Sequence, residues 1–509
     1  MAEKTAVSGE STATFTGSAS LRRLASLRQW LRSALFRQTA SGPIGWRKIT
    51  VAVVLVVAGA VVSLARTGGA GALNTIWIED AKVFLNQALN EPVLKTITTQ
   101  YNGYYNMVPR AATAVAVLFP LRWAPAVMSS FAALEYATFG LIAYIASGPH
   151  LRSRWLRLLI AIPACVIPLG YTQANNDLAT VQFVALYGTF WLLLWLPGTR
   201  AGRVISPVVM LGVTLTSILP LVFAPLALAR LFVDRSKNTI ALFACYGFGL
   251  VVQESVSLRG LSNRSPNYYT SPLWVIKMYV SRAVPRSIFG EKALGGPGTD
   301  FSGNPVPLHI ASHAEHLALI SGAWIVVVAI VLIALARVTD PNWPLAITAG
   351  LFSVLVFLSE IVDNLTIVQP RYVIAPALLL YAAIVAMLRP RGVMQAAASA
   401  DAGASVKPAQ EAQPTEPAGS AQPAGSRAPG RRAGVRPVLT WCPVAVFAIL
   451  LAVAVGFNYR VTTNSRSISP AWSGVVAKAA ASCQKPGVTS YHFAYQWWYV
   501  QIPCSRVSS

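Results

Sequence analysis

Long apolar stretches divide this chain, and they limit its fold more than any other feature. Hydrophobic residues make up 54% of its 509 residues and charged residues only 12%. Several stretches reach the roughly 20 residues that a helix needs to cross a bilayer, which is more apolar sequence than the core of a soluble domain requires. The sequence therefore predicts an all-α polytopic membrane protein.

The basic residues indicate how this protein crosses the membrane. The net charge of +23 could indicate nucleic-acid binding, but Lys and Arg occur in short runs between apolar stretches and in two polar tails, which is typical of cytoplasmic loops. We therefore expect no nucleic-acid partner and a multi-pass protein of the inner or plasma membrane, with a cytoplasmic amino terminus and an external carboxyl terminus. About eleven transmembrane helices are expected, at residues 49–66, 126–147, 156–172, 178–197, 204–219, 220–234, 238–256, 317–338, 343–362, 372–388 and 440–457.

The polar regions complete the expected domain organisation. Residues 391–439 are rich in Ala, Pro, Gly and Ser, so they lack the large apolar side chains that a core requires. Residues 458–509, in contrast, contain enough aromatic residues to fold as a small module. The expected regions are a cytoplasmic basic tail (1–48), a transmembrane domain (49–390) with external loops 67–125 and 257–316, a disordered cytoplasmic linker (391–439), the last transmembrane helix (440–457) and an external tail (458–509).

Residues 104–121 are apolar but do not fit the alternation of sides. Pro109, Arg110 and Pro120 interrupt them, and a crossing here would move every later basic cluster to the wrong side of the membrane. We expect an interfacial or re-entrant element in the first external loop, where irregular backbone is tolerated when it does not face lipid.

Two of the five cysteines lie in the external tail. Cys483 and Cys504 share an oxidising location, so we expect a disulfide between them. The other three fall within or beside apolar stretches, where cysteine behaves as a small buried hydrophobe.

Adjacent acids follow the first span, at Glu79 and Asp80. Carboxylates at a membrane surface act as a general base toward a hydroxyl or as metal ligands. The stretch after Trp77 also has the apolar spacing of an amphipathic helix, and acids at a helix amino terminus are favourable for their interaction with the helix dipole alone. The spacing leaves both interpretations open.

Two short motifs within one architecture resemble a known family. Glu79-Asp80 opens the first external loop, and Gln369-Pro370-Arg371-Tyr372, followed by Pro376, begins a late span. Together with the order of spans from about residue 40 to 390, they resemble the GT-C superfamily of integral-membrane glycosyltransferases. The Glu-Asp order departs from the commoner Asp-Glu or Asp-Asp order of that family.

The resemblance implies a function for the transmembrane domain. It implies transfer of a sugar from a polyprenyl-phosphate donor to an envelope glycan or lipid acceptor on the outer face, with inversion. Asp80 would be the general base, and Glu79 would assist it or hold a divalent cation, Mg²⁺ or Mn²⁺; no other cofactor is implied. Arg371 would stabilise the leaving phosphate. Further candidates for substrate binding are Tyr104, Arg110, Asn176, Asp177 and Tyr372.

Other residues support different interpretations. Asn176 and Asp177 fit a turn between two spans as well as a substrate cavity. His309, His313 and His316 have the spacing of one helix face, but they lie where a span begins and we expect no metal there. Acids within or near spans are costly in lipid, so Glu135, Glu254 and Glu360 favour the alternative of a transporter or flippase for a lipid-linked or small polar substrate.

Overall fold

A computed structural model gives the fold of most of the chain. It describes residues 15–101, 103–170, 176–259, 271–294, 298–299, 305–306, 313–361, 369–391, 437–460, 464, 466–495 and 498–507. Several sequence predictions lie outside these residues, among them most of the linker 391–439, the centre of the loop 257–316, and His309.

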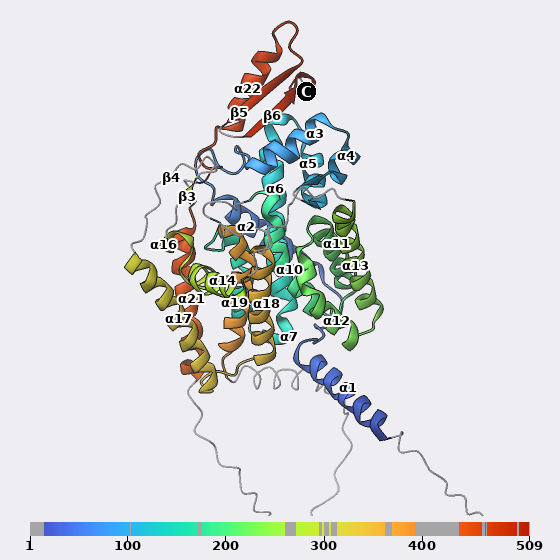
Figure 1. The fold of residues 1–509 in the computed structure, drawn as a ribbon, viewed down its shortest axis with the longest axis vertical. Helices are drawn as coiled ribbons and strands as arrows, with labels where there is room; N and C mark the ends of the chain where they lie inside the picture. The colour runs from blue at the N-terminus through green and yellow to red at the C-terminus, as the bar shows by residue number, and fades with distance from the viewer. Residues whose placement is uncertain are drawn as a thin grey trace, which may run out of the picture.

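Seven helices of the described residues are long and apolar enough to cross a membrane, as in a multi-pass membrane protein. They stand side by side in the body of the molecule (Figure 1). The spans are those of α2 (Trp46–Leu64), α6 (Ala124–Ala146), α13 (Lys237–Leu258), α17 (His313–Leu335), α18 (Trp343–Ile361), α19 (Ile374–Met387) with the 3₁₀ turn before it, and α21 (Pro437–Asn458).

The expectation of about eleven spans was wrong, because four of the expected segments form shorter helices. Within 156–172, one helix ends at Ala161 and a second begins at Pro163. Residues 204–216 belong to a helix that starts at Arg200 and contains Pro207. At 1.5 Å per residue, a ten-residue helix such as that within 220–234 is about 15 Å long, half of the bilayer core. The four segments contain α8 (Arg154–Ala161) with α9 (Pro163–Val166), α10 (Val181–Leu194), α11 (Arg200–Thr216) and α12 (Ala224–Val233).

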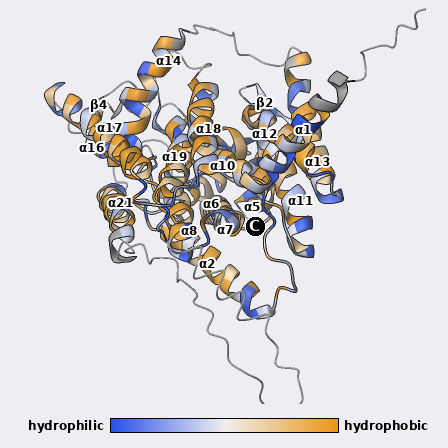
Figure 2. Cartoon of the chain, turned by 90° about the horizontal axis from the view of Figure 1, so that it is seen from below, coloured by the Kyte–Doolittle hydropathy of each residue, from blue (hydrophilic) through white to orange (hydrophobic). Residues whose placement is uncertain are grey.

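Two helices form the centre of the bundle. Every side chain of α10 and of α19 is buried, which suits helices that are apolar all round. Gly188 of α10 lies against the ring of Phe139 in α6, where a side chain would clash. The helices α17 and α21 lie at the rim of the bundle and are mainly hydrophobic (Figure 2), and most of their side chains are not buried.

The first loop after α2 folds against one end of the bundle. A π-helical turn at Asp80–Leu85 leads into α3 (Asn86–Asn90) and α4 (Val93–Thr98). A two-residue hairpin follows, in which β1 (Gln100–Tyr101) pairs with β2 (Tyr104–Tyr105). The segment expected to be interfacial or re-entrant contains α5 (Met107–Ala116), which is too short to span a bilayer.

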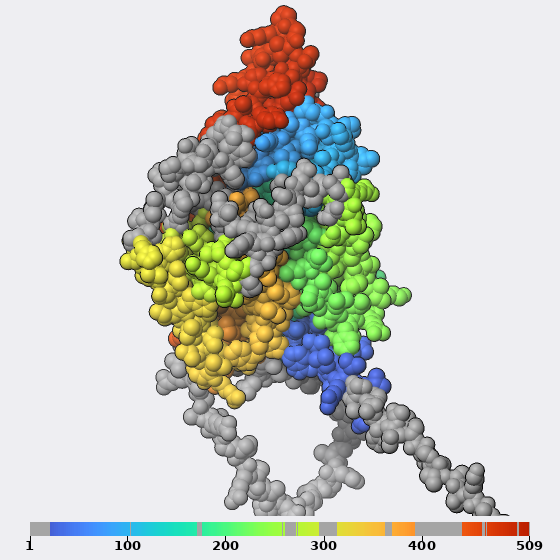
Figure 3. Space-filling view, in the orientation of Figure 1, coloured from blue at the N-terminus to red at the C-terminus, as the bar shows by residue number. Residues whose placement is uncertain are grey.

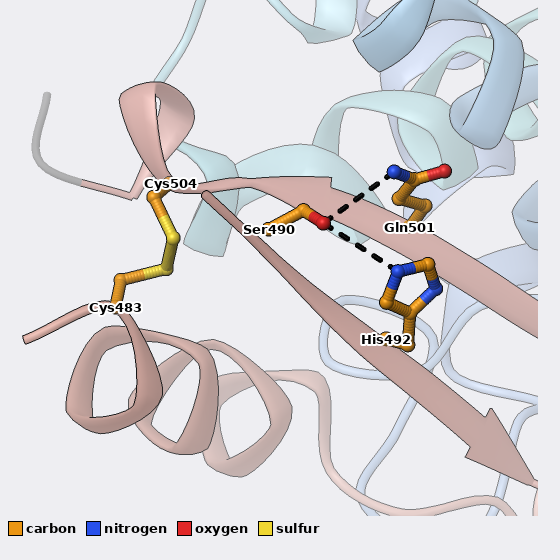
Figure 4. Close-up of a disulfide and its surroundings, with 5 residues drawn as sticks. All are labelled: Cys483, Ser490, His492, Gln501 and Cys504. Carbon is orange, nitrogen blue, oxygen red and sulfur yellow. Dashed lines mark hydrogen bonds between the residues drawn. A yellow bond between two sulfur atoms is a disulfide. The ribbon is translucent and has the colours of Figure 1, made fainter. Parts of the chain in front are cut away.

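The tail after α21 forms a small module on this loop. It comprises α22 (Trp472–Cys483) and the antiparallel hairpin of β5 (Ser490–Tyr495) and β6 (Trp498–Pro503). Cys483 and Cys504 form a disulfide that joins the helix to the end of the hairpin (Figure 4). The module rests on the first loop (Figure 3), where Asn86 accepts a hydrogen bond from the backbone N–H of Gln501 at 2.8 Å.

The remaining helices and strands are short or peripheral. At the opposite end from the module, α1 leaves the bundle (Figure 1). The α-helices and strands not yet described are α1 (Phe15–Ala34), α7 (Gly148–Leu151), α14 (Pro272–Met278), α15 (Val284–Phe289), α16 (Glu291–Leu294), β3 (Gly298–Thr299) and β4 (Pro305–Val306).

Candidate functional site

An ion pair joins the two sequence motifs. Glu79 Oε1 lies 3.6 Å from Arg371 Nη1, and both side chains are mostly buried, with exposed fractions of 13% and 18%. Glu79 immediately precedes the π-helical turn, whereas Arg371 lies in the 3₁₀ turn Pro370–Val373 that begins α19. Pro370 suits the first position of such a turn because it has no N–H to leave unsatisfied.

This ion pair lines a cavity of about 100 Å³ between the first loop and the bundle. One part of its wall is aromatic, from the loop, from α10 and from the turn before α19. The aromatic residues are Phe84, Tyr101, Tyr104, Phe183 and Tyr372. The polar part of the wall consists of Glu79, Asn106, Gln182, Ser359, Glu360 and Arg371.

The aromatic wall is held by its own contacts. Gln182 Nε2 donates a hydrogen bond to the hydroxyl of Tyr104 at 3.0 Å. The rings of Phe183 and Tyr372 meet edge to face, with centroids 5.8 Å apart, a geometry that aromatic pairs prefer. The guanidinium carbon of Arg371 lies 5.5 Å from the centroid of the Tyr372 ring. These contacts hold the aromatic side chains of the wall in place.

Several buried oxygens of the cavity wall have no hydrogen-bond partner among the described residues. They are Glu79 Oε2, Gln182 Oε1 and both carboxylate oxygens of Glu360. Glu360 lies near the end of α18 and is only 3% exposed. Buried polar atoms are normally satisfied, and leaving a charged one unsatisfied costs several kcal/mol (about 3–5). A polar or positively charged group in the cavity would satisfy these oxygens.

Asp80 faces another part of the molecule. Its two carboxylate oxygens accept hydrogen bonds from the backbone N–H groups of Leu178 and Ala179, each at 2.9 Å. It is 3% exposed and is not one of the described residues that line the cavity. Burial and, after it, the nearby carboxylate of Asp177 raise the pKa of Asp80 well above its usual value, although the two backbone bonds and Arg466 oppose this.

Asp80 belongs to a buried polar cluster with Asn176, Asp177 and Arg466. Asp177 caps the 3₁₀ turn Leu178–Thr180 by accepting a hydrogen bond from the N–H of Thr180. Asn176 bonds Ser63 of α2 twice, at 2.6 Å each. Arg466, from the segment before the tail module, donates to the backbone oxygen of Asn176 at 2.6 Å. This cluster fastens the first loop, the start of α10 and the tail to one another.

Arg110 forms a third environment beside the first loop. Its Nη1 donates to the backbone oxygen of Thr96 at 2.9 Å and to Gln87, and its guanidinium carbon lies 5.2 Å from the centroid of the Phe84 ring. Burial lowers the pKa of Arg110 to about 10. Phe84 lines the cavity whereas Arg110 does not, so Arg110 acts on the cavity only through its neighbours.

The structure thus divides the residues singled out in the sequence. It brings together Glu79, Tyr104, Arg371 and Tyr372, and it places Asp80, Asn176 and Asp177 in the polar cluster and Arg110 beside the loop.

Sequence reasoning missed part of the cavity wall. It did not identify Gln182 or Tyr101 as cavity residues, and it linked Glu360 to transport. One signal was available for Glu360, because this acid lies near the end of its expected span and the motif with Arg371 begins the next span. Nothing in the sequence marked Gln182.

A second, mostly apolar cavity of about 190 Å³ lies between α5, α6, α10 and α11. Among the described residues that line this cavity, Glu135 of α6 is the one acidic or basic residue. Because a carboxylate within a candidate span is costly in lipid, the position of Glu135 in α6 favours the alternative of transport.

Comparisons with known proteins add no relative: no protein family model, no curated protein and no solved structure matches this chain.

Proposed function

We propose that this protein is an inverting membrane glycosyltransferase that uses a polyprenyl-phosphate sugar donor and a glycan or lipid acceptor. The observation that carries the proposal is the meeting of Glu79 and Arg371 in one cavity, at 3.6 Å. Sugar transfer from a phosphate needs a base for the acceptor hydroxyl and a cation for the departing phosphate. These two side chains supply both.

Glu79 is the better-placed base of the two adjacent acids. Glu79 lines the cavity and its Oε2 has no hydrogen-bond partner among the described residues, whereas both oxygens of Asp80 accept backbone hydrogen bonds. In the proposed step, Glu79 takes the proton of the acceptor hydroxyl as its oxygen attacks the anomeric carbon. The bond from that carbon to the phosphate oxygen breaks, the phosphate leaves with the bonding electrons toward Arg371, and the anomeric configuration inverts.

The position of the cavity supports a site on the external face. It lies where the first loop meets the ends of α18 and α19, at the same end of the bundle as the disulfide-bonded module (Figure 1). Disulfides persist in oxidising compartments, so we assign this end to the external face, as the basic clusters also predict.

Substitution of Glu79 tests this proposal. Glu79→Gln keeps the shape but removes the base, so transfer from a radiolabelled polyprenyl-phosphate sugar by the purified protein should fall by about 10²–10⁴-fold. Glu135→Gln is the matched control, because it is the same change in the second cavity, and it should leave transfer intact. Wild-type turnover by Glu79→Gln would remove the assigned base.

The sugar and acceptor are found by mass spectrometry of the envelope in cells that lack the protein. A lipid-linked sugar should accumulate there, and a glycan or glycolipid should lose that sugar. If transport is the function instead, liposomes with the purified protein should move a substrate across the bilayer, and Glu135→Gln rather than Glu79→Gln should stop that movement.

A further inference from the structure

The charges in the wall of the cavity do not balance. Two carboxyl groups, Glu79 and Glu360, face one guanidinium, Arg371, and the described wall has no other Lys, Arg, His, Asp or Glu. Glu79 lies within ion-pair distance of Arg371, whereas neither oxygen of Glu360 bonds any described residue. Arg371 also attracts the Glu360 carboxylate electrostatically, but one guanidinium cannot balance two carboxylates, and an unbalanced carboxylate in such a place is unfavourable. A ligand that supplies a positive charge would restore the balance.

The aromatic wall indicates what kind of cation this is. Tyr101, Tyr104 and Tyr372 line the same cavity as Glu360. An ammonium group is attracted to the faces of aromatic rings and donates hydrogen bonds to carboxylates. A hard divalent ion instead prefers about six or more oxygen ligands, and no group of three acidic, His or Cys side chains suited to a metal occurs in the described part of the chain.

We propose, on the basis of the glycosyltransferase function above, that the transferred sugar carries a free amino group. Its ammonium lies between Glu360 and the tyrosine wall, while its anomeric phosphate lies against Arg371. An amino sugar phosphate carries both charges on one small ring, so one molecule complements both Glu360 and Arg371. The phosphate also draws Arg371 away from Glu79, which leaves Glu79 available to the acceptor hydroxyl.

Binding of water-soluble sugar phosphates to the full-length protein in detergent tests this inference without any transfer step. The probes are 2-amino and 4-amino hexose 1-phosphates, each beside its hydroxyl counterpart and its N-acetylated form. At neutral pH, at least one free amine should bind about tenfold more tightly than its hydroxyl counterpart, because hydrogen bonds between charged groups are stronger than neutral ones. Acetylation should abolish this preference.

Variants at Glu360 locate the effect. Glu360→Gln should bind amino and hydroxyl sugars alike, while Glu135→Gln should keep the full preference. If every amine binds no better than its hydroxyl counterpart, or if Glu360→Gln retains the preference, the inference is overturned. It is also overturned if the wild-type protein shows no amine preference but binds Mg²⁺ or Mn²⁺ alone, and Glu360→Gln abolishes this metal binding.

The two proposals fail in different ways. Transfer of a neutral sugar by a protein without amine preference would overturn the amino-sugar inference and leave the transferase function standing. Amine preference in a protein that transfers no sugar would support the binding site and overturn the transferase function.

Discussion

The carboxylates of Glu79 and Asp80, neighbours in the sequence, serve different parts of the molecule. Glu79 meets Arg371 in the cavity, whereas Asp80 accepts hydrogen bonds from the backbone of Leu178 and Ala179 at the start of the central helix α10. The π-helical turn begins at Asp80. One acid is therefore available to a ligand while the other holds the first loop against the bundle.

This division predicts a structural effect for Asp80→Asn. An amide has one oxygen, so one of the two backbone N–H groups would lose its acceptor and face an NH₂ group instead. Leaving a buried donor unsatisfied costs about 1–3 kcal/mol, so the variant should unfold at a lower temperature than wild type. The measurement is thermal unfolding of the purified protein in detergent.

Transfer activity separates this structural role from catalysis by Asp80. Below its unfolding temperature, Asp80→Asn should turn over within about tenfold of wild type, far above the loss expected when a general base is removed. A folded Asp80→Asn protein with the full loss of a missing base would instead support Asp80 as the base, as the sequence motif predicts.

The contact between Glu79 and Arg371 predicts coupling between their substitutions. Because the pair is mostly buried, removing one partner leaves the other charge uncompensated, and removing both should cost less than the sum of the single changes. We expect a coupling free energy of about 1–3 kcal/mol in a cycle of Glu79→Gln, Arg371→Gln and the double variant. Thermal unfolding of the four proteins measures it, and additive effects would show that the ion pair is not formed in solution.

Seven spans could be predicted from the sequence, since their apolar length distinguishes them without knowledge of contacts. Apolar length did not exclude the four other expected spans, which the structure shows to be shorter helices. Residues 178–197 are as apolar as a span, but α10 ends at Leu194 and its side chains are all buried in protein. Composition reports that a helix avoids water, and it does not distinguish burial in protein from contact with lipid.

The candidate site could be predicted in part. Short motifs identified Glu79 and Arg371, but which of two adjacent acids faces a cavity depends on the path of the backbone at the π-helical turn. Gln182 and Glu360 come from α10 and α18, outside either motif. Their convergence is a property of tertiary packing, and no periodicity along the chain encodes it.

His150 predicts acid sensitivity at the end of α7. Its ring is fully buried, and burial, followed by repulsion from Arg37 and Arg389, lowers its pKa from 6.5 to about 3. Between these values the unfolded chain binds a proton that the folded chain does not, so the stability present above pH 6.5 is lost as the pH falls. The expected slope is about 1.4 kcal/mol per pH unit.

Unfolding free energies measured between pH 4 and about 7 test this effect. His150→Phe should flatten the dependence on pH, whereas His492→Phe should not, because His492 is an exposed residue on β5. An unchanged slope in His150→Phe would assign the acid sensitivity to other groups.

The disulfide between Cys483 and Cys504 predicts a link between the redox state of the tail and the candidate site. The bond closes a loop with a sequence separation of 21 residues, for which chain entropy predicts about 3 kcal/mol of stabilisation. The hairpin that it holds contacts α3 through Asn86 and Asn90, which bond the backbone of Gln501. Replacing both cysteines by Ser should therefore speed proteolysis of the tail and also lower transfer by loosening the loop that carries Glu79.

Cys442→Ser is the matched control, because Cys442 is an exposed cysteine of α21 that lies outside the disulfide. It should change neither proteolysis nor transfer, and mild reduction of the wild-type protein should reproduce both effects of the double substitution. If the tail of the double variant is cleaved faster while transfer stays at the wild-type rate, the module stabilises only itself, and the contacts of Asn86 and Asn90 do not position the site.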